Sequence, residues 1–308
     1  MQKIFQQTID KIITFEGIGL HSGNTSRVKL IPTAANQGIV FKRTDIKENN
    51  IIQANYNNVS SAKLCTTLEN SSGHKISTVE HLLAAFYIVG IDNVIVEIDN
   101  EEVPIMDGSS KDFIEILNNT GTKILNKKVK YLKIIKRVEM KDDGRNISID
   151  PSNLNFEVKF ELNYSNSIIG NQKNTVDFSG DNLEDIYSSR TFCLYKDIEK
   201  IKKSGLAKGG SLENAVVVDD KRVINEEGLR NEKEFVNHKI LDLAGDFLLS
   251  GFRILGSVSC YRGGHELSNL FLRKLLKSES SFKVFEFNNI ELPKKTQVNQ
   301  PHKLVVNA

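Results

Sequence analysis

The sequence predicts an α+β protein made of two similar β-α-α-β layered domains that pack face to face, with an insertion in the second domain. Three observations predict this class. The chain has 308 residues, which is enough for two domains of ordinary size. Each half runs through short strands, a capped helix, a further strand and a second helix in the same order. The stretch 187–230 has no counterpart in the first half, so we interpret it as the insertion.

In the first half, alternating apolar and polar residues bounded by turn residues predict strands at 27–31 and 38–42. Ser77, with Glu80 three residues later, is typical of a capping box, and Gly90 is a suitable end for the helix that follows. The next predicted elements are a strand at 93–99 and a helix that follows 107–110 and passes through Phe113, Ile114 and Leu117.

The segment 121–130 is rich in lysine and weakly patterned, so we place the boundary there and expect domains at 1–125 and 126–308. The second half then repeats the order of the first. Its predicted elements are strands at 131–135, 146–149, 155–160 and 252–260, a helix from the cap pattern 231–234 to Gly251, and a helix at 266–276. We expect the polar stretch from about 278 to be a peripheral tail.

Composition and charge exclude several classes of protein. The hydrophobic fraction of 39% excludes wholesale disorder, and the net charge of +2 provides no overall field for nucleic acid. The longest uncharged apolar stretch, 82–91, is far shorter than the roughly 20 residues of a membrane-spanning helix. The three cysteines are odd in number and far apart, and the N-terminus has no apolar region typical of a signal peptide. We therefore expect a cytoplasmic protein without a disulfide framework.

A candidate metal site follows from the spacing of two residues in the second half. His238 and Asp242 lie four residues apart in a predicted helix, so their side chains share one face. This spacing often arises by chance, and a structural hydrogen bond or a solvated face is the alternative. His81, in the first turn of the corresponding helix, is the natural third ligand. Two imidazoles and one carboxylate leave a position open on a tetrahedral ion, as in catalytic zinc sites.

Three further residues are candidates for acid–base chemistry. Glu80 is either the capping-box partner of Ser77 or a general base that acts on water at the metal. His265 follows two glycines, which allow a side chain to be presented into a cleft, although a lone histidine after a turn is often simply exposed. A neighbouring carboxylate such as Asp246 would raise the pKa of His265 and keep it cationic.

Other conspicuous segments carry weaker signals. The glycine-rich segments 17–23 and 205–211 resemble phosphate-binding loops only superficially, because both lack the Walker order of residues. Cys65 is most simply a buried or half-buried thiol, and we also include it among the candidate substrate contacts.

Seven motifs, in order over about residues 1–280, together resemble the UDP-3-O-acyl-N-acetylglucosamine deacetylases of lipid A synthesis. Each motif alone is weak, whereas the ordered set is highly specific. The motifs are GIGLHSG at 17–23, STVEHLLAA at 77–85, DGSS at 107–110, RTF at 190–192, KGGSLENA at 208–215, HKILDLAGD at 238–246 and GGH at 263–265.

The resemblance implies a metal-dependent hydrolase that removes an N-acetyl group from an acylated UDP-amino sugar. It implies Zn²⁺, with Fe²⁺ as the alternative, held by His81, His238 and Asp242 between the two domains. Glu80 would be the general base, and His265, paired with Asp246, would be the cationic acid or stabiliser. These roles agree with those inferred from spacing alone.

The resemblance also implies substrate contacts. Thr191 would donate its hydroxyl to the developing oxyanion, Phe192 would line the site for the sugar and the acetyl group, and Lys239 would lie near the diphosphate or the sugar. Residues from about 190 to 220 would build an apolar passage for the 3-O-acyl chain. The chain departs from the family at Cys193, where a glycine is usual beside this passage, and at 166–167, where Asn-Ser replaces a His-Pro dipeptide.

We expect a monomer that acts on an acylated UDP-amino sugar and has neither a nucleic-acid partner nor an integral membrane segment. Two alternatives remain open. One is a zinc amidohydrolase of another acetylated amino sugar. The other is a non-enzymatic RNA-binding module, because small α+β layers and basic runs recur in such proteins.

Overall fold

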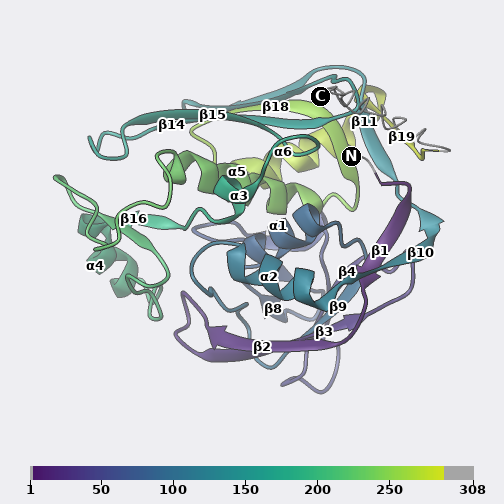
Figure 1. Cartoon of the computed structure of the whole chain (residues 1–308), viewed down its shortest axis with the longest axis horizontal. Helices are drawn as coiled ribbons and strands as arrows, with labels where there is room; N and C mark the ends of the chain where they lie inside the picture. The colour runs from purple at the N-terminus through teal and green to yellow at the C-terminus, as the bar shows by residue number, and fades with distance from the viewer. Residues whose placement is uncertain (1–2, 288–308) are drawn as a thin grey trace, which may run out of the picture.

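The computed structural model describes residues 3–287 and shows an α+β protein in which helices lie between two sheets (Figure 1). The sheet of the first half has five strands in the order β2-β3-β9-β4-β5, of which only β4 and β9 run parallel to each other. Alternate residues of β3, such as Val28 and Leu30, are buried against the helices, as expected for a strand with one covered face. These strands are β2 (Ile13–Ile18), β3 (Thr25–Pro32), β4 (Ile39–Arg43), β5 (Ile51–Gln53) and β9 (Val94–Ile98).

The sheet of the second half has seven strands. The long strand β18 is its centre, because it pairs in parallel with β11 and β14 and antiparallel with β13. The other three strands pair with these partners, β12 with β13, β15 with β14 and β19 with β11. The strands are β11 (Tyr131–Ile134), β12 (Val138–Asp142), β13 (Arg145–Asp150), β14 (Phe156–Asn163), β15 (Asn171–Asp177), β18 (Arg253–Tyr261) and β19 (Phe282–Phe285).

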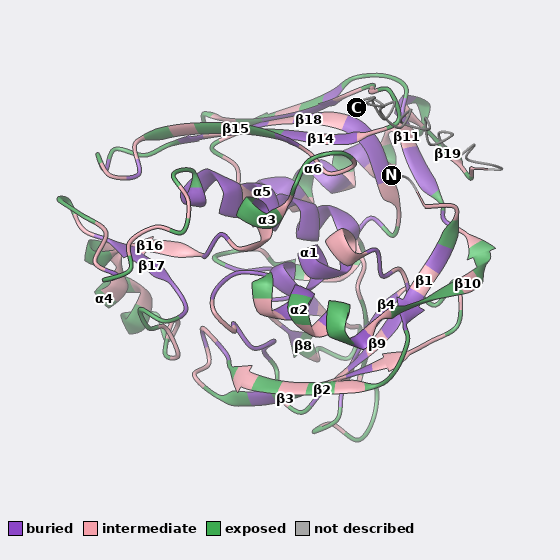
Figure 2. Ribbon diagram, viewed as in Figure 1, coloured by how far each residue is buried: buried purple, intermediate pink, exposed green. Residues whose placement is uncertain are grey.

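Four helices fill the space between the sheets and are largely buried where they meet (Figure 2). The helix α5 packs against α1 on one side and against β14 and β15 on another. Every residue of α5 except Lys239 is therefore buried, as expected for a helix covered on all sides. The helices are α1 (Glu80–Val89), α2 (Lys111–Thr120), α5 (Glu234–Leu248) and α6 (His265–Lys277).

A glycine allows α1 and α5 to approach closely. A Cβ atom placed on Gly245 of α5 would lie 2.1 Å from the backbone oxygen of Glu80 at the start of α1. Only a residue without a side chain fits at this distance. The contact brings the first turn of α1, with Glu80 and His81, against the middle of α5.

Most predicted helices and strands are confirmed, but the predicted capping box is wrong. The helix α1 begins at Glu80 itself, and its N-cap is Val79, which makes no side-chain capping bond. Ser77 Oγ instead donates a hydrogen bond to the backbone oxygen of Glu101, at 3.2 Å. Ser77 lies two residues before the N-cap Val79, and the chain turns between them at Thr78, where φ is 57°. Gly90 ends α1 in a left-handed conformation, as predicted.

The segment 121–130, predicted as a weakly structured boundary, contains a strand. β10 (Thr122–Lys128) pairs antiparallel with β1 (Phe5–Ile9) in a two-stranded ribbon. No residue of β10 is buried, so the strand lacks the apolar alternation by which strands are recognised. The division into domains at 1–125 and 126–308 stays a prediction.

The predicted insertion, 187–230, contains two short parallel strands joined through a helix and lies at one side of the molecule (Figure 1). We expected a peripheral tail from about 278, but β19 in this segment pairs with β11 at the edge of the large sheet. Residues 288–308 of that tail lie outside the described part of the chain. The remaining elements are β6 (Val59–Ser61), β7 (Thr67–Glu69), β8 (Lys75–Ile76), α3 (Glu184–Tyr187), β16 (Phe192–Leu194), α4 (Tyr195–Lys203) and β17 (Val216–Val218).

Two further findings concern expectations from the sequence. No helix in residues 3–287 has the length and apolar character needed to span a membrane. All three cysteines are free, as expected.

The close approach of α1 and α5 yields a test of the fold. Replacing a helical glycine by alanine normally stabilises a helix by about 1 kcal/mol. We expect Gly245→Ala to do the opposite and to lower the free energy of unfolding by about 1–3 kcal/mol, because the new methyl group overlaps the Glu80 carbonyl. Urea denaturation measures the change. Gly180→Ala, where a Cβ atom meets nothing closer than 3.9 Å, is the control, and equal stability of the two variants would contradict the contact.

Candidate active site

The three predicted metal ligands meet between α1 and α5. His81 lies in the first turn of α1, and His238 and Asp242 lie one turn apart on α5. All three are buried, and one ligand atom from each lies within 4.8 Å of the others. The structure thus brings together residues separated by about half the chain into one group that can hold a metal ion.

The atoms of this group fit a metal ion better than they fit each other. Nε2 of His81 and Nε2 of His238 each lie 3.4 Å from Oδ1 of Asp242, which is beyond a good hydrogen bond. This buried Oδ1 has no hydrogen-bond partner among the described residues. Two atoms that bind one tetrahedral ion at about 2.1 Å lie roughly 3.4 Å apart. The observed separations are therefore those of ligands around an ion.

The surroundings hold the ligands in the forms that bind metals. Nδ1 of His238 lies 3.1 Å from the backbone oxygen of Ser189, which favours a proton on Nδ1 and a free lone pair on Nε2. Burial lowers the pKa of His238 to about 3, so the ring is neutral. Burial opposes ionisation of Asp242, but its neighbours His238, Lys239 and His265 outweigh this effect and hold its pKa well below the usual range.

A carboxylate–histidine pair lies beside the metal group, as predicted. His265 is the first residue of α6, and its Nδ1 lies 2.9 Å from Oδ2 of Asp246. Its other ring nitrogen, Nε2, lies 3.6 Å from Oε1 of Glu80. Burial by itself would lower the pKa of His265, but the carboxylates of Asp246, Glu80 and Asp242 outweigh burial and raise it to about 10. This imidazole is therefore cationic at neutral pH.

Thr66 is a site residue that the sequence analysis missed. Its hydroxyl donates to Oδ1 of Asp246 at 2.7 Å, and its backbone N–H donates to Oε2 of Glu80 at 3.0 Å. Thr66 therefore fixes two of the three carboxylates that face His265. No spacing rule links position 66 with 80 and 246, so only the fold reveals this role.

Glu80 is buried with one oxygen held by Thr66 and the other directed toward His265. Burial raises its pKa above the usual value for a glutamate. A carboxylate whose pKa lies closer to neutrality accepts a proton more readily from a reacting group.

An apolar cavity of about 470 Å³ adjoins the site, between the insertion and the first half of the chain. Thr191, a predicted catalytic residue, and Phe192, a predicted substrate contact, line it together with apolar side chains such as Ile198 and Val217. The ring of Phe192 lies 6.3 Å from that of His238, so this cavity opens next to the metal group.

The structure describes the surroundings of two further predicted substrate contacts, Lys239 and Cys65. Lys239 Nζ donates to Oδ2 of Asp242 at 2.8 Å and lies over the Phe192 ring, so its nearest partner is a metal-ligand candidate. Cys65 is buried, and burial together with the charge of Glu80 raises its pKa to about 12. Its neighbour Leu64 lines the apolar cavity, and a contact between the Cys65 thiol and a substrate stays a prediction.

The two glycine-rich segments pack against each other. The backbone N–H of Gly209 donates to the oxygen of Leu20 at 3.1 Å, and that of Lys208 donates to the oxygen of His21 at 3.3 Å. A Cβ atom on Gly209 would lie 2.3 Å from the oxygen of Gly19. These glycines therefore serve chain packing, and the packing closes one wall of the apolar cavity.

His21 is a second residue whose environment the sequence did not reveal. It lines the apolar cavity and is buried, yet neither ring nitrogen has a hydrogen-bond partner among the described residues. The carboxylate of Glu102 holds this turn in place by accepting the backbone N–H groups of His21, at 2.8 Å, and Ser22, at 2.7 Å.

The fold and the site together are typical of a metal-dependent hydrolase, in which two histidines and one carboxylate hold an ion and a carboxylate base stands beside it. Residues 6–277 match the family described as LpxC, UDP-3-O-acyl N-acetylglycosamine deacetylase. The chain belongs to this family.

Individual relatives agree. The chain is 42% identical over 288 residues to the UDP-3-O-acyl-N-acetylglucosamine deacetylase of Shewanella frigidimarina. The matched residues are 92% of this chain and 94% of the relative. It is 40% identical to the protein of the same name from Photobacterium profundum, over 94% of this chain and 96% of the relative. It is 42% identical to that of Geobacter sp. strain M21, over 92% and 93% respectively.

The ligand geometry predicts that Asp242→Ala abolishes tight metal binding, because it removes the only carboxylate of the group. We expect metal content to fall by at least about tenfold after dialysis. Elemental analysis of the purified protein measures this, with circular dichroism to confirm folding. Asp246→Asn, which alters the partner of His265 rather than a ligand, should keep its metal, and full metal content in Asp242→Ala would contradict the assignment.

Proposed function

We propose that this chain hydrolyses the N-acetyl group of a UDP-3-O-acyl-N-acetylglucosamine and releases acetate in lipid A biosynthesis, as a cytoplasmic monomer. The observation that carries this proposal is the buried group of His81, His238 and Asp242, with its unpartnered carboxylate oxygen beside an apolar cavity. Amide hydrolysis at a metal ion needs a group of ligands of this kind, and the acyl chain of the substrate needs an apolar cavity.

We further propose that the group holds zinc, with ferrous iron as the alternative, since two neutral imidazoles and one carboxylate suit either ion. When bound, the ion polarises the amide carbonyl and lowers the pKa of a water molecule to about 7. Oδ1 of Asp242 is buried and has no hydrogen-bond partner among the described residues, as expected for an oxygen that binds such an ion.

Glu80 is the proposed general base. It takes the proton from the attacking water, and its raised pKa suits this role. Thr66 holds one carboxylate oxygen through its backbone N–H, which leaves the other to face the reacting atoms. The orientation of Glu80 is therefore set before substrate arrives.

His265 and Thr191 are the proposed stabilisers of the negative charge that develops on the amide oxygen. The cationic imidazole of His265 is held by Asp246, and Asp246 is held in turn by Thr66. A well-placed donor of this kind contributes about 3–4 kcal/mol to catalysis. The leaving amine then receives its proton from Glu80 or His265.

The two ends of the substrate have separate candidate sites. The apolar cavity of about 470 Å³ suits the 3-O-acyl chain, and Phe192 at its mouth suits the sugar. A second cavity of about 570 Å³, whose lining includes Arg262 and Tyr164, offers a cation and a ring for a nucleoside diphosphate. We propose that Lys239 contacts the sugar or the nearer phosphate.

The apolar cavity also distinguishes this function from the closest alternative. A hydrolase of short acetylated amino sugars has no use for an apolar cavity next to its metal group. Cys193 is half-buried in the wall of this cavity, so we propose that its side chain influences which acyl chains fit.

Acetate release from a UDP-3-O-acyl-N-acetylglucosamine, measured with the metal content of the same sample, tests the function. UDP-N-acetylglucosamine without the acyl chain is the comparison substrate. We expect turnover of the acylated substrate only, and equal turnover of both would favour the alternative hydrolase.

Replacement of the base separates catalysis from metal binding. We expect Glu80→Gln to keep its metal while kcat falls by about 10²–10⁴-fold, because the water loses its proton acceptor. Glu16→Gln, at a largely exposed position, is the control and should behave as the unmodified chain. Normal turnover of Glu80→Gln would remove Glu80 from the mechanism.

The pH profile provides a further test. Glu80 must be deprotonated, and its raised pKa places the acid limb above the usual range of a glutamate. His265 must stay protonated, and its pKa of about 10 places the alkaline limb there. The profile of kcat/KM should therefore be a broad bell. An alkaline limb near the ordinary pKa of histidine would show that the three carboxylates do not hold this proton.

A further inference from the structure

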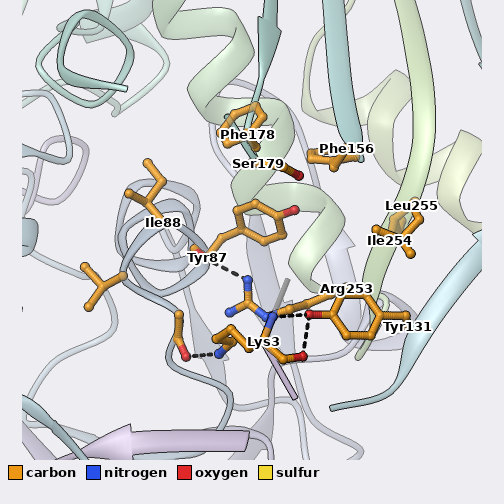
Figure 3. A pocket seen from close by; sticks show the side chains of 12 residues that line it. Lys3, Tyr87, Ile88, Tyr131, Phe156, Phe178, Ser179, Arg253, Ile254 and Leu255 are labelled. Carbon is orange, nitrogen blue, oxygen red and sulfur yellow. Dashed lines mark hydrogen bonds between the residues drawn. The ribbon is translucent and has the colours of Figure 1, made fainter. Parts of the chain in front are cut away.

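A cavity of about 280 Å³ lies on the far end of α1 from the candidate active site (Figure 3). It is formed where the C-terminal turn of α1 meets β11, β14 and the start of β18. None of the candidate catalytic, substrate-contacting or metal-binding residues lines it. Since Glu80 begins α1 and Tyr87 lies at the cavity, the two sites are separated by about two turns of helix, or roughly 10 Å.

One end of this cavity carries two cations that share a single carboxylate. Arg253 Nε lies 3.0 Å from Oδ1 of Asp92, and Lys3 Nζ lies 2.8 Å from Oδ2 of the same residue. Arg253 Nη1 donates to the backbone oxygen of Tyr87 at 3.1 Å. The third nitrogen, Nη2, is buried and has no hydrogen-bond partner among the described residues. One positive charge therefore lacks a counter-ion.

The protonation of Lys3 reflects this imbalance. Burial, followed by the charge of Arg253, lowers the pKa of Lys3 to about 7, although Asp92 acts in the opposite direction. Two uncharged polar groups also contact Lys3. The ammonium donates to the backbone oxygen of Gly90, and the Tyr131 hydroxyl accepts the Lys3 backbone N–H at 2.8 Å. A second negative charge in the cavity would stabilise the ammonium form.

The other end of the cavity is aromatic. The Tyr87 ring lies 5.6 Å from the rings of both Phe156 and Phe178. Figure 3 shows the Tyr87 hydroxyl directed away from Arg253 toward Phe156 and Ser179. The guanidinium carbon of Arg253 lies 5.0 Å from the centre of the Tyr87 ring, so the charged and aromatic ends are continuous.

We propose that this cavity binds a small organic anion that carries one carboxylate on a compact, flat apolar body. The carboxylate would lie at Arg253 and Lys3, and the body would pack among Tyr87, Phe156 and Phe178. A single uncompensated positive charge matches a monocarboxylate better than a phosphate, which carries more charge and would meet the apolar walls. The volume lies at the lower limit for ligand sites, so the ligand is smaller than a drug-sized molecule.

Calorimetric titration of the full chain with benzoate tests this site, with benzyl alcohol as the uncharged probe of similar shape. We expect one benzoate to bind per chain, at least about tenfold more tightly than benzyl alcohol. Lys3→Met should weaken benzoate binding by about tenfold and leave benzyl alcohol unchanged. Lys11→Met, which removes an exposed lysine from the same terminal segment, is the matched control.

A second measurement needs no variant. Because binding should raise the pKa of Lys3 above about 7, benzoate affinity should be constant at lower pH and fall as the pH rises above about 7, and Lys3→Met should abolish this dependence. Equal affinity for the two probes, or benzoate binding that Lys3→Met leaves intact, would overturn the proposal. The latter result would indicate that benzoate binds at the metal group instead. Neither outcome bears on acetate release, so the proposed function is tested separately.

Discussion

The contact between Gly245 and the backbone of Glu80 is the constraint on which the site depends. It allows α1 and α5 to lie close enough for His81 to join His238 and Asp242 around one point. The same contact places Glu80 at the edge of that group. The two helices are buried between two sheets, so neither can move away without exposing apolar surface (Figure 2). The positions of the three candidate ligands and of Glu80 are thus a product of core packing.

Beside the metal group, electrostatics are arranged around a single buried cation. His265 faces Asp246, Glu80 and Asp242, and these carboxylates together outweigh the cost of burying its charge. Thr66 links two of the three carboxylates through its hydroxyl and its backbone N–H. Removal of any one partner would therefore alter the others, because each carboxylate is held partly through its neighbours.

The sequence was sufficient to predict four of the six described α-helices and the group of candidate metal ligands, but not the contacts that orient them. His238 and Asp242 were found because the helical repeat places them on one face. The role of Thr66 could not be found, since it depends on residues distant in the chain meeting in space. The capping box at Ser77 was wrong because a left-handed residue intervenes, and β10 was missed because an exposed ribbon has no apolar alternation. Patterns of burial can be read from a sequence, whereas contacts between separate segments cannot.

The contact between Gly209 and Gly19 affects the order in which parts of the protein fold. The wall of the apolar cavity is completed only when segments about 190 residues apart in the chain have met. Contacts of such long range form late, because ordering the intervening chain costs entropy before the contact is made. Helices form from local contacts, so a nascent chain can possess helices while the wall of this apolar cavity is still unfinished.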